Sequence, residues 1–287
     1  MQKPLSKRLN LFFPQWQGAS RIELYKGAQL LYKFLSDEFD FIQVPVSSTY
    51  SLASDKNILG YFQILNQFLA ANRILHSENP AKIFTLGGDC GIEIAPISFL
   101  NKRYDSSLSI IWLDAHGDLN TPISSPSHHF HGMPLRLLLG EGDRTILSHR
   151  FSSLSASQIF LVGLRELDLP EQEFIRHNRL AVFPPREINS GNYERLISRL
   201  EKVGSNKLYV HLDLDVISPQ EFPYVACPSP GGVRLDRLQN LLIRLSKRFD
   251  IVGFSILEFL PCGRQKEAAS KVISLLKGAN LLSLSTV

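Results

Sequence analysis

Residues 108–118 read LSIIWLDAHGD, an apolar run that ends in three ionisable side chains at alternate positions. Residues 208–215 repeat the arrangement, with two aspartates behind a second apolar run. Alternate residues of a strand point the same way, and the carboxyl ends of parallel strands are where open α/β sheets build their sites. The side chains that converge in this way are Asp114, His116, Asp118, Asp213 and Asp215.

Four carboxylates and an imidazole in one place would repel strongly, because like charges raise one another's pKa. A single aspartate after a strand is commonly a turn former or a helix cap. Five alternating ligands on two strands instead favour a metal site, since charges are seldom buried without a partner. A pair of divalent cations would neutralise the charges of these carboxylates.

Composition predicts one globular domain over residues 1–287, because 44% of the residues are hydrophobic and can bury one large core. The basic N-terminus lacks the apolar segment of a signal peptide, and no uncharged run reaches about 18 residues. We therefore expect a soluble, cytoplasmic protein with no membrane partner. A net charge of +4 without a Lys/Arg block argues against a nucleic-acid partner. The three cysteines, Cys90, Cys227 and Cys262, indicate a reducing compartment or a functional thiol.

Strand-like and helix-like segments alternate along the chain, which implies a parallel sheet covered on both faces. Helical spacing of apolar residues recurs in five segments, namely Ile22 to Leu35, Ile58 to Ile74, Tyr193 to Val203, Leu235 to Leu245 and Ala268 to Leu276. Strands are expected near residues 8–13, 41–46, 82–86, 108–114, 158–163, 180–183, 207–213 and 250–256. The irregular stretches 119–131 and 216–233 follow the ligand pairs, where such a sheet builds substrate contacts.

Six short segments together resemble the arginase (ureohydrolase) family over about residues 80–262. They are Gly87 to Cys90, Asp114 to Pro122, His131 to Pro134, Gly163 to Asp168, Asp213 to Pro219 and Leu257-Glu258. The resemblance implies a three-layer αβα sandwich with a central, mostly parallel eight-stranded sheet. It also implies two Mn²⁺ ions that activate a shared water against a guanidino carbon. Carboxylate and imidazole ligands suit Mn²⁺.

The resemblance assigns roles to individual residues. Asp114, Asp118 and Asp213 would be shared between the two metals, and His116 and Asp215 would bind one of them. His131 would transfer a proton to the departing amine; the alternative is a surface histidine, as we read His128 and His129. Glu258 would pair with the substrate guanidinium. Its alternative role, an N-cap or exposed carboxylate, fits the apolar run 256–260 poorly, because an unpaired charge there would be costly.

The other end of the substrate needs polar partners. Asn120, Ser125 and Ser127 are the candidates for an α-carboxylate, and Asp168 and Glu171 are the candidates for an α-ammonium group. All five are residue types that also form ordinary loops, and Arg136 could instead take up the carboxylate. These residues predict a guanidino amino acid as the small-molecule partner and explain agmatine, which lacks the carboxylate, less well.

Cys90 departs from the family pattern, which has a metal-ligating histidine at this position. A thiolate is a softer ligand than an imidazole, so it favours binding of Zn²⁺ or Fe²⁺ over binding of Mn²⁺. Three readings compete: a ligand in a variant centre, a neutral buried thiol beside a weakened site, and the mark of a degenerate relative. A branch that hydrolyses Nω-hydroxy-L-arginine looks to share the cysteine, and we favour the metal ligand. Ser218 replaces a family aspartate, and Cys227 is read as packing.

The sequence thus predicts a binuclear metal hydrolase that converts arginine or Nω-hydroxyarginine to ornithine and urea or hydroxyurea. Agmatinase and formimidoylglutamase are the alternatives within the enzyme class, the latter with Arg136 or Arg165 as partner of a second carboxylate. An alternative of another class is a metal-poor binding or regulatory protein, which Cys90 and Ser218 would favour. Members of the family often form trimers or hexamers, so a homo-oligomer is compatible with the resemblance.

Overall fold

A sheet of eight strands, all parallel to their neighbours, forms the centre of the computed structural model, which describes residues 8–49 and 51–282. The basic segment at residues 1–7 lies outside the described residues. The strand order is β2-β1-β5-β10-β9-β6-β7-β8. The strands are β1 (Arg8–Phe13), β2 (Ile42–Gln43), β5 (Lys82–Gly87), β6 (Ser109–Leu113), β7 (Ile159–Val162), β8 (Ala181–Phe183), β9 (Lys207–Asp213) and β10 (Asp250–Leu257).

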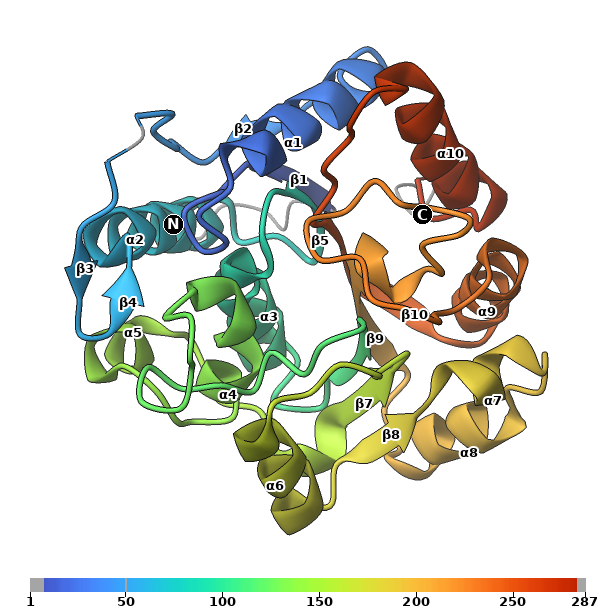
Figure 1. Cartoon of the computed structure of the whole chain (residues 1–287). Coiled ribbons are helices and arrows are strands. Elements are labelled where there is room, and N and C mark those ends of the chain that lie inside the picture. The colour runs from blue at the N-terminus through green and yellow to red at the C-terminus, as the bar shows by residue number, and fades with distance from the viewer. Residues whose placement is uncertain (1–7, 50, 283–287) are drawn as a thin grey trace.

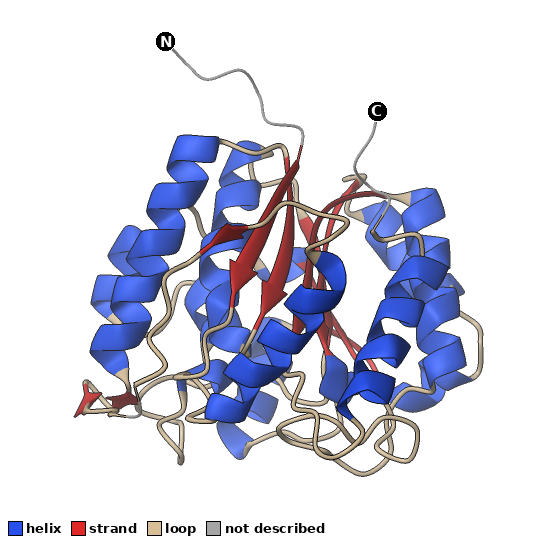
Figure 2. Cartoon of the chain, turned by 90° about the horizontal axis from the view of Figure 1, so that it is seen from above, coloured by secondary structure: helices blue, strands red, loops and turns tan. Residues whose placement is uncertain are grey.

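Helices cover both faces of this sheet (Figures 1 and 2). One face carries α1 (Ile22–Leu35), α7 (Pro185–Asn189), α8 (Glu194–Lys202), α9 (Leu235–Arg248) and α10 (Gln265–Gly278). The other carries α2 (Tyr61–Glu78), α3 (Ile94–Arg103), α4 (Pro134–Leu138), α5 (Arg144–His149) and α6 (Leu169–Asn178). The predicted three-layer αβα sandwich is confirmed.

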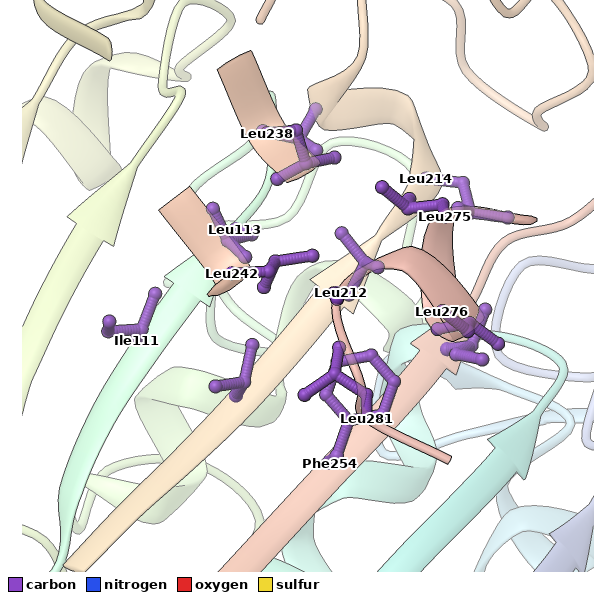
Figure 3. Close-up of a cluster of buried hydrophobic side chains, with 14 of the residues drawn as sticks. Ile111, Leu113, Leu212, Leu214, Leu238, Leu242, Phe254, Leu275, Leu276 and Leu281 are labelled. Carbon is purple, nitrogen blue, oxygen red and sulfur yellow. The ribbon is translucent and has the colours of Figure 1, made fainter. Parts of the chain in front are cut away.

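The alternation of side chains along each strand divides the core into two clusters. Ile111, Leu113 and Leu212 face α9 and α10, where they pack with leucines of both helices (Figure 3). Trp112 and Tyr209 point to the opposite face and pack with the second cluster. Because strands buried on both faces need apolar residues at nearly every position, they read as continuous hydrophobic runs. Each fully buried leucine contributes about 1.5–3 kcal/mol.

Several element boundaries differ from the sequence-based expectation, and two of these differences have a local cause. The helix expected from Ile58 begins instead at Tyr61, because Ile58–Leu59 form the short strand β4, which pairs antiparallel with β3 (Ser54–Asp55). The strand expected at 41–46 shortens to β2, since Pro45 has no N–H to donate to a ladder. Within the described residues, no helix is long and apolar enough to cross a membrane.

Candidate metal centre

Four adjacent strands of the sheet, β5, β10, β9 and β6, deliver the predicted metal ligands and Glu258. Cys90 starts the 3-10 turn η1 (Cys90–Glu93) after β5, and Asp114 directly follows β6. Asp213 ends β9, and Asp215 lies in the next turn, η4 (Leu214–Val216). Glu258 directly follows β10. Since the strands are parallel, these side chains meet at one edge of the sheet.

The ligand atoms fall into three groups, two of which share the Asp114 carboxylate. Asp114, His116 and Asp215 form one group, and the ligand atoms within each group lie within 4.8 Å of one another. The second consists of Cys90, Asp114, Asp118 and His211. Asp213 joins a further group with Cys90 and Glu258. Two groups with a common carboxylate are suited to hold two cations side by side.

The electrostatics of Asp118 test whether these residues fit cations. Its Oδ2 atom is buried and has no hydrogen-bond partner among the described residues. Burial, and then the nearby Asp114 carboxylate, raise the pKa of Asp118 well above its ordinary value. Its backbone takes the left-handed φ of 51°, a strain of about 1–3 kcal/mol that recurs at functional sites. A buried carboxylate oxygen without a partner fits a divalent cation.

Asp213 and His116 lead to the same conclusion. Burial, and then Asp215, raise the pKa of Asp213 well above its ordinary value. The His116 Nδ1 atom lies 2.9 Å from Asp215 Oδ2 and 3.5 Å from Asp114 Oδ1. Burial alone would lower the pKa of His116, but the two carboxylates raise it strongly. The oxygen and nitrogen donors therefore suit metals such as Mn²⁺, Fe²⁺ or Zn²⁺.

A tight turn presents Cys90. A Cβ atom on Gly88 would lie 1.8 Å from the carbonyl oxygen of Gln15, so only glycine fits there. The Asp89 carboxylate accepts hydrogen bonds from Gln15 Nε2 and from the backbone N–H groups of Gly18 and Gly91. Cys90 Sγ lies 3.3 Å from Asp213 Oδ2. Burial, and then Asp213, raise the pKa of the Cys90 thiol well above its ordinary value, so a thiolate here requires a cation.

His211 is the residue of the centre that the sequence reasoning missed. It is fully buried, and its Nε2 atom lies 3.5 Å from Asp114 Oδ2. Burial alone would lower its pKa, but contacts with Asp114 and Glu93 raise it. The signal was present in the sequence, because His211, Asp213 and Asp215 alternate as Asp114, His116 and Asp118 do.

A pocket opens onto this centre. His131 and Glu258 lie in its wall, with His131 Nδ1 3.2 Å from Glu258 Oε1. Burial alone would lower the pKa of His131, but the Glu258 carboxylate raises it. Glu258 Oε2 is buried without a hydrogen-bond partner among the described residues. The lining residues are His116, Asp118, Asn120, Ser125, Ser127, His129, His131, Gly132, Asp168, Glu171, Asp213, Asp215, Cys227 and Glu258.

All five residues predicted to read the far end of the substrate line this pocket. Asn120 Nδ2 donates to Asp168 Oδ2 at 2.8 Å. Both Glu171 oxygens accept backbone N–H groups, from Leu119 and from Asp168, each at 2.9 Å. The Ser125 and Ser127 hydroxyls accept the backbone N–H groups of the two histidines that follow. The five side chains therefore also hold the wall of the pocket together.

The two arginines considered for a substrate carboxylate lie elsewhere. Arg136 pairs with Glu141 at 2.6 Å, and Arg165 donates to backbone carbonyls, among them that of Asp215 at 2.6 Å. The described lining residues include no lysine or arginine. Cys227 lines the pocket, and burial raises its pKa to about 11. Ser218 lies outside the lining and donates to Gln220.

Comparison with known proteins agrees with this geometry. The sequence profile of the arginase family matches residues 39–277. This chain belongs to the arginase family. An arginase of Staphylococcus aureus (strain MSSA476) is 31% identical over 242 residues, which cover 82% of this chain and 80% of that protein. As an arginase-family protein, the chain is a hydrolase of amidine C–N bonds.

Solved structures share the arginase-like fold. Entamoeba histolytica arginase, solved in complex with L-ornithine, has a TM-score of 0.86 at 20% identity and covers 96% of this chain and 99% of its own. Formimidoylglutamase from Bacillus subtilis subsp. subtilis str. 168 has a TM-score of 0.73 at 16% identity, covering 99% of this chain and 89% of its own. Solved structures of an arginase and of a formimidoylglutamase share this fold, so the fold does not identify the substrate and the pocket must do so.

Proposed function

We propose that this arginase-family hydrolase cleaves the guanidino group of arginine or Nω-hydroxyarginine and releases ornithine with urea or hydroxyurea. The observation that carries the proposal is Glu258, whose buried Oε2 atom has no hydrogen-bond partner among the described residues. The same carboxylate lines the pocket with His116, Asp118 and Asp213. A planar guanidinium offers paired N–H donors to such a carboxylate, which both orients it and balances its charge.

The proposed centre holds two divalent cations through Asp114, His116, Asp118, Asp213 and Asp215, with Cys90 as a further ligand. When bound, two such cations lower the pKa of a shared water and stabilise charge at the attacked carbon. The identity of the cations is part of the proposal: Mn²⁺ suits the oxygen and nitrogen donors, whereas the Cys90 sulfur favours Zn²⁺ or Fe²⁺.

His131 is the proposed proton donor to the departing amine. Its Nδ1 atom contacts the carboxylate that would hold the guanidinium, at 3.2 Å, so the imidazole stands beside the carbon–nitrogen bond to be cleaved. Glu258 raises the pKa of His131 against the effect of burial. A histidine that keeps its proton until the C–N bond weakens can act as a general acid.

The far end of the substrate would meet the loop after β6 and the start of α6. Asn120, Ser125 and Ser127 offer polar atoms to an α-carboxylate. Asp168 is the stronger candidate for an α-ammonium group, because both Glu171 oxygens already accept backbone N–H groups. Glu171 then supports the site by holding Asp168 and the backbone at Leu119.

The lack of a cationic lining among the described residues separates the candidate substrates. Formimidoylglutamate carries a second carboxylate that an arginine or lysine would pair, and Arg136 is occupied by Glu141. Agmatine has no α-carboxylate for the serines and Asn120. Nω-hydroxyarginine offers an oxygen that can itself ligate a metal, so it suits a centre whose Lewis acidity a thiolate has lowered.

The test is a substrate panel on protein purified without chelator, with the metal content measured on the same sample. We expect about two metals per chain and ornithine release from arginine or Nω-hydroxyarginine. Preferred turnover of agmatine or formimidoylglutamate would replace the proposed substrate. Metal that stays near zero after Mn²⁺ or Zn²⁺ is added, together with no ornithine release, would overturn the proposed activity.

A further inference from the structure

We propose that His211 is a metal ligand, so that the position next to Cys90 is a site of one sulfur, one nitrogen and two carboxylates. Its members are Cys90, His211, Asp114 and Asp118, whose ligand atoms lie within 4.8 Å of one another. The inference rests on the proposed binuclear centre and deepens it. It concerns an imidazole that comes from within β9, which lies between β10 and β6 in the sheet, whereas Cys90 follows β5, on the far side of β10.

The spacing of the donor atoms fits one ion. His211 Nε2 lies 3.8 Å from Cys90 Sγ and 3.5 Å from Asp114 Oδ2. Of these two separations, the one between nitrogen and the Asp114 oxygen exceeds the usual N–H···O length of about 2.7–3.2 Å. Both are close to the distance of about 3.4–3.6 Å between neighbouring ligands in a tetrahedral site with metal–sulfur bonds of about 2.3 Å and metal–nitrogen bonds of about 2.0–2.1 Å.

A buried carboxylate fixes the orientation of the imidazole. His211 Nδ1–H donates to Glu93 Oε1 at 2.9 Å, which leaves the Nε2 lone pair directed at Cys90 and Asp114. Glu93 is held in turn by the Tyr209 hydroxyl at 2.6 Å and by the Ser255 hydroxyl. A histidine that gives its second N–H to a carboxylate is the usual arrangement of a metal ligand in proteins.

The ring plane is fixed as well. Trp112 is paired with His211 in the β6–β9 register, and the two rings stack with centroids 3.6 Å apart at 12°. The Trp112 indole N–H donates to Asp114 Oδ2 at 3.2 Å, so one side chain orients two of the four ligands. If His211 served only to pack the core, its Nε2 atom would not need to face the Cys90 thiol and the Asp114 carboxylate.

The proposed ligand set predicts that the two metal positions favour different cations. Sulfur and imidazole donors favour Zn²⁺, Fe²⁺ or Co²⁺, whereas the position of Asp114, His116 and Asp215 offers only oxygen and nitrogen and suits Mn²⁺. We therefore expect one tightly held soft cation per chain and one exchangeable position that accepts Mn²⁺.

Proton NMR of the full chain loaded with Co²⁺ tests the inference directly, because each ligating imidazole gives its own strongly shifted, solvent-exchangeable N–H signal. We expect signals from two imidazoles, those of His116 and His211. His211→Phe keeps an aromatic ring against Trp112 and should lose one signal and one Co²⁺ per chain. His149→Phe, at the exposed end of α5, is the matched control and should lose neither.

Glu93→Gln is the second variant, and it leaves His211 in place. We expect it to weaken binding of one Co²⁺ about 10–100-fold, as loss of a ligand-orienting carboxylate does. A wild-type spectrum with one imidazole signal in a protein that binds two Co²⁺ and hydrolyses substrate would overturn the inference and leave the proposed function intact. Two imidazole signals in a protein that does not hydrolyse substrate would support the inference and overturn the proposed function. Failure to bind Co²⁺ would overturn both.

Discussion

Glu258 shows how a single backbone position prepares a binding group. It follows the buried strand β10 and takes the left-handed φ of 61°, which costs a non-glycine residue about 1–3 kcal/mol. The Glu258 N–H donates to Gly88 O at 2.7 Å, and Oε1 accepts the Cys90 N–H at 3.1 Å. The strained turn thus points a carboxylate with one open oxygen into the pocket.

Glu258→Gln should lower kcat/KM for the preferred substrate by about 10–100-fold, because a hydrogen bond to a charged group contributes about 1.5–3 kcal/mol. Glutamine keeps the shape of the side chain but cannot balance the guanidinium charge. Steady-state kinetics with elemental analysis of the same preparation would check this. Unchanged kcat/KM would contradict the guanidinium role, and loss of a metal would identify Glu258 as a ligand instead.

At the scale of elements, the amino ends of three adjacent strands are joined by charge. Asp250 begins β10 and lies between Lys82, the first residue of β5, and Lys207, the first residue of β9, at 2.7 and 2.6 Å. Burial alone would raise the pKa of Asp250, but the two lysines lower it below the ordinary value of 3.8. This triad lies at the edge of the sheet opposite the metal centre.

Asp250→Asn should destabilise the protein at neutral pH by about 0.5–1 kcal/mol, since partly exposed ion pairs contribute little. The folded-state pKa is the lower one, so the contribution is complete above pH 3.8 and is lost as the pH falls through the folded-state value. Urea unfolding at neutral and at acid pH would measure it. The difference in free energy of unfolding between wild type and variant should decrease in acid and at high salt. A difference that increases in acid would contradict the proposed stabilisation by the Asp250 ion pairs.

At the scale of the whole molecule, the proposed metal centre ties the middle of the sheet together. Its ligands lie at the ends of β5, β9 and β6, with Glu258 after β10. Without cations, buried carboxylates such as Asp118 and Asp213 have their pKa values raised by burial and by one another. Cations bound at these residues would therefore stabilise the folded state as a whole.

Removal of metal should lower Tm by roughly 5–10 °C, because a ligand at about 100 times its Kd adds about 2.7 kcal/mol and each kcal/mol shifts Tm by about 2–4 °C in a chain of about this size. Calorimetry before and after chelation, and after Mn²⁺ or Zn²⁺ is restored, would measure the shift. Asp118→Asn should remove metal, activity and most of the metal-dependent shift together. Retained turnover in a variant that has lost its metal would contradict the proposed centre.

The order of elements and the ligand pairs could be read from the sequence because both follow from local periodicity. Apolar runs that end in alternating Asp and His residues mark strand ends, and parallel strands bring those ends to one edge. Helix α1 was expected at the residues it occupies, whereas α3 to α7 were not anticipated, because helices of 5–10 residues carry few turns of periodic signal.

The sequence by itself therefore determined the sheet and its two helical layers, and it predicted every proposed metal ligand except His211. Only the tertiary structure decided which of these atoms meet. It placed His211 of β9 against Cys90 after β5, with β10 between the two strands, paired Arg136 with Glu141 outside the pocket, and engaged both Glu171 oxygens with backbone N–H groups. The physical reason is that periodicity within a segment is local, whereas the partners of a buried charge come from segments far apart in the chain.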